Sequence, residues 1–260
     1  MISELLYVYG LIPANELDPD GELSFQTKRH GDILAVFDAV DPDVFSQEMI
    51  DKHADDPSWV KEKAVVHHSM LAMLRQRCTV IPLKFCTIFE GERSLEAMLS
   101  QYEVEITALF TTLKGKEEWN LKVYGDKEKL KSHVMQSSNE TEAELSGLSP
   151  GKQFLMRKQM NARLEVQFDN EMKRICLAMH ESLSKEAVEK SVKKVWDRKV
   201  TGRKEDMIWN SVYLMDRQKV DCFLQLVNHY NDEYQAAGLA FEATGPWPVY
   251  HFARLHSENA

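Results

Sequence analysis

No apolar run in this 260-residue sequence approaches the roughly 20 residues that a membrane-spanning helix needs. The opening MISELLYVYGLI also lacks the basic start of a signal peptide, and Glu4 interrupts its apolar stretch. We therefore predict no membrane span, and we interpret this opening as a β-strand.

The sequence has no excess of basic residues, since 32 Lys and Arg stand against 41 Asp and Glu, for a net charge of −9. Such a chain is a poor electrostatic match for DNA or RNA, so we expect no nucleic-acid partner. Its four cysteines form no CxxC pair. Dispersed cysteines of this kind are typical of buried thiols rather than of a metal site.

The sequence also lacks the short motifs that are typical of common catalytic and ligand-binding sites. It has no GxGxxG or GxxxxGK[ST] loop to hold phosphate, no GxSxG for a serine nucleophile and no HExxH for zinc. We therefore predict no catalytic residue, no cofactor and no metal ion.

The adjacent histidines His67 and His68 are the strongest candidates for chemistry. Neighbouring helical residues point about 100° apart, so the pair cannot easily hold one metal ion. His67 shares the apolar helix face with Leu71 and Leu74, whereas His68 does not. We expect His67 to be a half-buried histidine bonded to a neighbouring carbonyl. The alternatives are a catalytic or metal-binding role and a packing contact specific to the fold.

Alternating and helical patterns divide the first half of the chain. Residues 4–12 and 31–40 read as strands, with a turn-rich loop or a poorly ordered hairpin between them. A helix begins at residues 57–58, and a second helix covers about 94–113. The apolar stretch between these helices reads as a strand, in which Pro82 predicts an edge, a bulge or a break because proline cannot donate to a ladder.

The second half repeats the mixture. Strands are predicted at 117–125, 207–216 and 239–245, and Trp119 lies on the buried face of the first. Asp126 can cap a following helix, and the next polar residues predict a flexible connection. The long helical segment 153–199 is expected to continue as a second, shorter helix from Ser184, carrying Val188, Val192 and Val195. The elements suggest an α+β domain with helices on one face of its sheet, like a split βαβ unit.

Five stretches, taken in order, resemble the GvpF/GvpL family of gas vesicle proteins. They are YVYGL (7–11), VVHHSMLAMLRQRCTVIPLKFCTIF (65–89), EWNLKVYGD (118–126), NSVYLMDR (210–217) and TGPWPVYHF (244–252). The family-motif positions are His67, His68, Pro82, Phe85 and Trp119. Lys84 stands where arginine is usual, and Cys86 stands where the family has glycine, so we expect a gentler bend at Cys86.

The resemblance implies a fold of two α+β domains with ferredoxin-like features and a C-terminal tail. We assign residues 1–115 to the N-terminal domain, 116–245 to the ferredoxin-like domain and 246–260 to the tail. The tail is expected to pack across the body, against the N-terminal domain, and to fix the relative orientation of the domains. The residues expected to dock it are Pro246, Trp247, Pro248, Tyr250 and Phe252.

The resemblance also implies an accessory or minor structural protein of gas vesicle assembly, not an enzyme. Its expected partners are the small apolar shell protein and other gas vesicle accessory proteins. We expect it in the gas vesicle, and in the cytoplasm before or during assembly, with a monomer favoured. An adaptable methionine surface could hold the shell protein, although core positions are favoured for each methionine. The alternatives are an oligomeric scaffold built on the long helix and a hydrolytic enzyme using His67 or His68.

Overall fold

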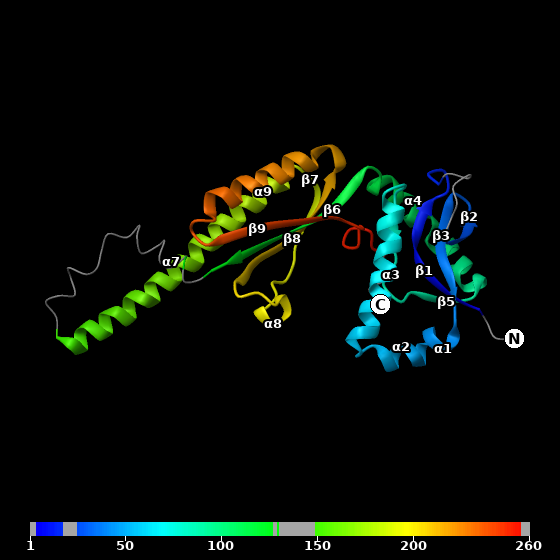
Figure 1. The fold of residues 1–260 in the computed structure, drawn as a ribbon. Helices are drawn as coiled ribbons and strands as arrows, with labels where there is room; N and C mark the ends of the chain where they lie inside the picture. Colours follow the sequence, from blue (N-terminus) through cyan, green and yellow to red (C-terminus); the bar gives the residue numbers. More distant parts are fainter. Residues whose placement is uncertain (1–3, 18–24, 127–128, 130–148, 256–260) are drawn as a thin grey trace. The chain divides into compact units, whose positions relative to one another are not determined.

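The computed structural model describes residues 4–17, 25–126, 129 and 149–255. The chain divides into two compact units: unit 1 comprises residues 1–118 and 246–260, and unit 2 comprises residues 119–245. Each unit combines a β-sheet with helices (Figure 1). The predicted α+β class is therefore confirmed.

Unit 1 is built on a five-stranded sheet with β1 at its centre. The order is β2-β3-β1-β4, and β5 also pairs with β1. β1 runs antiparallel to β3, β4 and β5. The strands are β1 (Leu5–Pro13), β2 (Gln26–His30), β3 (Ile33–Val40), β4 (Ile81–Pro82) and β5 (Ile88–Glu90).

Pro82 ends β4 after two residues, and the chain rejoins β1 only at β5. The prediction of a break at Pro82 is confirmed. Between the two strands the chain stays close to β1, because the Leu83 N–H donates to the Tyr9 carbonyl at 3.0 Å. The connection β4–β5 (residues 83–87) therefore has a fixed position beside the centre of the sheet.

Two long helices cover the faces of this sheet. α3 (Pro57–Arg75) begins after Asp56, whose side chain accepts the backbone N–H groups of the first turn. Its buried residues, His67, Leu71 and Leu74, meet the sheet face that carries Tyr7. α4 (Glu92–Leu113) packs on strands β1 to β4. β1 is buried along nearly its whole length, as expected of a central strand covered on both faces.

Unit 2 has the element order β6-α7-β7-β8-α9-β9 and the strand order β7-β8-β6-β9. This βαββαβ arrangement, with β6 between β8 and β9, is the split βαβ of ferredoxin-like domains. The elements are β6 (Lys116–Gly125), α7 (Pro150–Ser184), β7 (Ala187–Val192), α8 (Arg198–Thr201), β8 (Asp206–Asp216), η1 (Arg217–Lys219), α9 (Val220–Tyr234) and β9 (Leu239–Trp247).

The core of unit 2 lies between the sheet and the helices α7 and α9. Trp119, Leu121 and Val123 from β6 meet Phe223 and Val227 from α9. Apolar residues of α7 complete it with Phe168, Met172, Ile175, Cys176, Met179 and Leu183. Phe168, Met172, Ile175, Met179 and Leu183 recur every three or four residues, so they form one continuous apolar stripe of α7 that faces the core.

The helix predicted from Ser184 is wrong. α7 ends at Ser184, and the chain then forms β7, which pairs antiparallel with β8. The valines at 188 and 192 have stiff β-branched side chains that suit a strand. The four-residue spacing of these valines is also typical of a helix. The segment forms a strand because it pairs with β8.

Of the two alternatives for the segment between the first two predicted strands, the loop is wrong over residues 26–30, which form β2 and make a hairpin with β3. β2 is polar and follows no apolar alternation, so its own sequence gives little strand signal. The hairpin connection to β3 is the two residues Gly31 and Asp32, with Gly31 at a φ of 55°. Gly-Asp is a favoured pair for a two-residue hairpin connection, so it was the feature of the sequence that could have predicted β2.

Two short helices, α1 (Pro42–Phe45) and α2 (Gln47–His53), precede α3 and were not predicted. The helix predicted after Asp126 and the flexible connection after it lie almost wholly outside the described residues. Lys129 is described, and its N–H donates to the Asp126 carboxylate at 3.3 Å.

Candidate functional site

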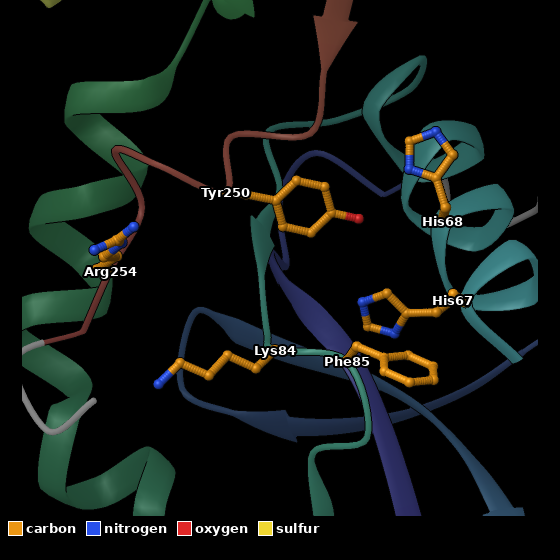
Figure 2. Close-up of a pocket in the computed structure, with 7 residues that line it drawn as sticks. His67, His68, Lys84, Phe85, Tyr250 and Arg254 are labelled. Carbon is orange, nitrogen blue, oxygen red and sulfur yellow. The ribbon is translucent and has the colours of Figure 1, made fainter. Parts of the chain in front are cut away.

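A pocket of about 560 Å³ opens in unit 1 where three distant segments meet. Figure 2 shows the side chains around it. Three lining residues come from α3, two from the β4–β5 connection and two from the C-terminal tail: Ala64, His67, His68, Lys84, Phe85, Tyr250 and Arg254. Its size falls within the usual range of small-ligand pockets.

His67 is the most buried polar group of the pocket, with 3% of its surface exposed. Its Nδ1 lies 3.0 Å from the hydroxyl of Tyr7. The same hydroxyl accepts the backbone N–H of Cys86 at 3.1 Å. Among the described residues these are the two partners of the Tyr7 oxygen, so its own proton is available for His67.

The hydrogen bonds of Tyr7 therefore set the tautomer of His67. Burial raises the pKa of Tyr7, which keeps its phenol protonated and able to donate. Nδ1 of His67 is then the acceptor, and a neutral imidazole must carry its proton on Nε2. Nε2 is buried and makes no side-chain hydrogen bond among the described residues, and the backbone of Leu83 is the hydrogen-bonding neighbour of the ring. Figure 2 shows the His67 ring projecting from α3 into the pocket.

The His67 ring is neutral near pH 7. Burial is the main cause that lowers its pKa, to about 4, and the nearby backbone of Leu83 opposes this only in part. The tyrosine hydroxyl of β1 occupies Nδ1, a partner that the sequence did not indicate. The hydrogen bond with the Leu83 backbone agrees with the predicted carbonyl partner, and the side chain is buried rather than half-buried. The prediction that His67 packs on the apolar face of the helix is confirmed.

The C-terminal residues up to 255 lie in unit 1. The ring of Trp247 stands 5.3 Å from that of His68, measured between centroids. Tyr250 lines the pocket with 38% of its surface exposed. Burial, and then the charge of Glu118, raise the pKa of Tyr250 to about 12. Pro248, Val249, Ala253 and Leu255 are buried.

Glu118 anchors this segment through the main chain. Its carboxylate oxygen Oε2 accepts the backbone N–H of His251 at 2.8 Å, and the side chain is 2% exposed. Glu118 is not a lining residue. The described lining residues of the pocket include Lys84 and Arg254 and no acidic side chain.

The structure brings together some of the predicted site residues and separates others. His67, His68, Phe85 and Tyr250 line the pocket, and Trp247 contacts His68. Pro246 and Phe252 are half-buried outside the lining, and Pro248 is buried there. Pro82 pairs with Gly10, and Trp119 belongs to the core of unit 2.

Tyr7, Glu118 and Arg254 were not selected from the sequence. Tyr7 sits in a strand whose aromatic residues all look like core, and nothing in the spacing links it to His67. Arg254 lies two residues after the motif TGPWPVYHF (244–252). Its position next to this motif was the feature of the sequence that could have indicated it.

The predicted gentler bend at Cys86 is wrong. Its φ is 62°, so the chain keeps the left-handed conformation that favours glycine. Cys86 is the one non-glycine residue with a positive φ in the described part of the chain. The hydrogen bond from the Cys86 backbone N–H to the Tyr7 hydroxyl stabilises this conformation beside the pocket.

A second pocket, of about 570 Å³, lies in unit 2 between α7, β8 and the segment 195–197. Met172 and Met207, which line it, are buried, as are Met179 and Met215. These four methionines are core, so they do not form an exposed methionine face.

No group of three or more His, Cys, Asp or Glu side chains within the described ranges could hold a metal ion. Over the same ranges, every helix is too short or too polar to cross a membrane.

The family model described as gas vesicle synthesis protein GvpL/GvpF matches residues 5–254. This chain belongs to the GvpL/GvpF family. Gas vesicle protein L of Streptomyces sp. (strain CB03234) is 26% identical over 264 residues, covering 99% of this chain and 96% of that protein. Gas vesicle protein F1 of Halobacterium salinarum is 22% identical over 258 residues, covering 98% and 95%.

The crystal structures of two GvpF proteins have the same fold. That of Microcystis aeruginosa GvpF gives a TM-score of 0.65 at 19% identity, covering 96% of this chain and 99% of that chain. That of Anabaena sp. PCC7120 GvpF gives 0.66 at 18% identity, covering 97% and 99%. Family membership places this GvpL/GvpF protein in gas vesicle formation.

Proposed function

We propose that this protein is an accessory protein of gas vesicle assembly that binds the small apolar shell protein at the pocket of unit 1. One observation carries the proposal. Two of the stretches by which the chain resembles its family, 65–89 and 244–252, lie about 150 residues apart and supply most of this pocket. A surface built from the stretches that mark the family is the best candidate for the contact that its members share.

The chemistry around the pocket suits an apolar partner. Phe85 and Tyr250 form apolar walls, and Val65 and Val66 of α3 are more than half exposed beside Ala64. A shell subunit with exposed apolar surface aggregates unless it is held by a partner. The net charge of −9 keeps the holder itself dispersed.

In this proposal the protein helps to begin or guide shell formation in the cytoplasm and accompanies the growing gas vesicle. Other accessory proteins of the vesicle are its further partners. It acts without catalysis. A general base needs a pKa near the operating pH, and the pKa of His67, about 4, is far from neutrality.

A second candidate is an oligomeric scaffold, because α7 exposes large apolar side chains in unit 2. Phe154 is 70% exposed, Leu155 60% and Val166 61%. Light scattering over a range of concentrations tests this candidate. A scaffold requires that the measured mass of the wild type grows with concentration, and that Phe154→Gln keeps the mass of a monomer.

The shell-protein proposal is tested by co-purification of the tagged full chain with the shell protein. Val65→Asp places a charge beside the pocket and should reduce capture at least tenfold, because a desolvated charge opposes an apolar contact. Val104→Asp on α4 is the matched control, since Val104 is 84% exposed and does not line the pocket. Equal capture by the wild type and both variants would reject the proposal.

A further inference from the structure

Unit 2 carries a surface segment that combines basic residues with exposed apolar side chains. Residues 188–204 hold seven lysines and arginines against Glu189 and Asp197, although the whole chain has a net charge of −9. Single exposed apolar side chains are normal, but a cluster of them marks an interaction site. The large apolar side chains that this segment exposes are Val188, Val192, Val195, Trp196 and Val200.

The pairing of β7, an edge strand of the sheet, sets the direction of two of these side chains. Its register with β8 places Lys190 opposite Tyr213 and Val192 opposite Ser211. Directly opposed residues of an antiparallel pair lie on the same face of the sheet. Because the Tyr213 hydroxyl lies 2.7 Å from Nδ1 of His180 on α7, Lys190 and Val192 lie on the face that α7 covers.

The chain stays beside β8 after β7 ends. The Lys193 N–H donates to the Asn210 carbonyl at 2.8 Å, and the Asn210 side chain donates to the Lys194 carbonyl at 2.8 Å. Trp196 lines the unit 2 pocket together with Met172 of α7, so it also lies on the α7 side. Side chains alternate between faces along an extended chain. One row at alternate positions, the lysine row, therefore consists of Lys190, Val192, Lys194 and Trp196.

The two lysines of this row are available to a partner. Both are exposed, and within the described ranges neither ammonium group has an ion pair or a hydrogen bond. Four residues of extended chain separate them by about 13 Å. Two nearby arginines are already engaged, since Arg198 binds Asp206 and Arg203 binds Glu242.

The pocket at the end of the row offers apolar walls in a volume of about 570 Å³. Its acidic residues add little free negative charge. Asp197 caps α8, and Asp206 binds Arg198. Asp169 lies one helical turn before Lys173, which lines the same pocket. The apolar walls include Phe168, Met172, Val195, Trp196 and Trp209.

We propose that the lysine row and the unit 2 pocket bind an acidic polypeptide segment in which carboxylates stand between apolar side chains. The carboxylates pair with Lys190 and Lys194, and an apolar side chain enters the pocket beside Trp196. A wide polyanion such as a membrane or a nucleic acid also meets the negative charge of the rest of the chain, whereas a short segment meets the local lysines alone. The inference rests on the proposed function only for the identity of the partner, a further accessory protein.

The test follows the indole N–H of Trp196 by NMR in the full chain. The probe is a synthetic peptide with glutamates between leucine and phenylalanine residues. One match replaces its glutamates with glutamine, and a second replaces its apolar residues with serine. The probe should shift the Trp196 signal and bind at least tenfold more tightly than either match. Its affinity should fall with added salt, because exposed ion pairs are screened.

Exposed side chains keep the test independent of folding. Lys190→Gln and Lys194→Gln should each weaken binding of the probe about threefold, as expected of exposed ion pairs. Trp196→Ala should weaken it at least tenfold, because aromatic anchors contribute most to such contacts. Lys61→Gln is the matched control, since Lys61 is an exposed lysine of unit 1, and it should bind as the wild type does.

Equal binding of the probe and its glutamine match, an unmoved Trp196 signal, or an equal loss in Lys61→Gln would overturn the inference. Vesicles of phosphatidylserine and phosphatidylcholine that bind through Lys190 and Lys194, when the probe does not bind, would also overturn it in favour of a membrane partner. Failure of the proposed function gives a different pattern, in which the probe binds unit 2 and the shell protein is not captured. Capture of the shell protein without probe binding would retain the proposed function and reject this inference.

Discussion

The hydroxyl of Tyr7 lies 3.0 Å from Nδ1 of His67, joining the central strand of unit 1 to helix α3. Because the same oxygen accepts from Cys86, one hydroxyl ties together β1, α3 and the connection between β4 and β5. The contact fixes the tautomer of a histidine that lines the pocket. It also makes the stability of unit 1 depend on pH.

Acid should destabilise the protein through His67. Its pKa is lowered by burial from 6.5 to about 4, so between these values the unfolded chain binds a proton that the folded chain does not. The free energy of unfolding therefore falls as the pH falls, by up to about 3 kcal/mol at 1.36 kcal/mol per pKa unit. His67→Gln cannot titrate and should flatten this slope in urea unfolding between pH 7 and pH 4. The control is His229→Gln on the exposed face of α9, and an unchanged slope in His67→Gln would contradict the assignment.

Glycine should be better than alanine at position 86. Cys86 has a φ of 62°, and a side chain in this left-handed conformation costs about 1–2 kcal/mol that glycine avoids. Because Cys86→Gly and Cys86→Ala both remove the thiol, their difference isolates the backbone. We expect the glycine variant to unfold at a higher urea concentration, by about 1 kcal/mol. At a site with ordinary φ the order is reversed, so a more stable alanine variant would count against the left-handed conformation.

Gly10→Ala should destabilise unit 1 strongly. A Cβ at Gly10 would lie 2.7 Å from the carbonyl oxygen of Ile81, and backbone cannot move aside as a side chain can. Overpacking of this kind costs about 1–3 kcal/mol. Gly151→Ala in the first turn of α7 is the matched control, because a Cβ there meets nothing within 4 Å. Thermal unfolding should show a loss for Gly10→Ala and no loss for Gly151→Ala.

Glu118→Ala should loosen the tail. The carboxylate accepts the His251 N–H at 2.8 Å from a buried position, and its removal leaves that amide without this acceptor. Hydrogen exchange of the His251 amide should accelerate at least tenfold, while amides of α9 keep their rates. Glu118→Gln retains an acceptor oxygen and should show a smaller change. Equal exchange in all three proteins would mean that Glu118 does not hold the tail.

The sequence was most informative where the apolar pattern of a single helix or strand is enough to predict that element. The alternation around Trp119 predicted β6, and the apolar spacing of α3 placed His67 on the buried face. It failed where pairing with a distant strand decides, as in β7, whose valines have a helical spacing and whose partner is β8. It also failed at β2, where the hairpin with β3 overrides a polar composition.

The pocket could be predicted only in pieces. His67, Phe85 and Tyr250 were selected because they stand in family motifs. The sequence does not reveal that His67 contacts Tyr7, which lies 60 residues away and sets the tautomer of the imidazole. Lys84 was noted only as a departure from the motif, and its place in the lining depends on the break that Pro82 imposes on the strand.

The account depends most on where the shell protein binds, and hydrogen exchange of the full chain with and without that protein measures this directly. We predict protection of the α3 amides at residues 64–68 and of the tail amides at residues 249–255, the segments that line the pocket of unit 1. Protection confined to α7, β7 and β8 of unit 2, with these two segments unchanged, would contradict the account.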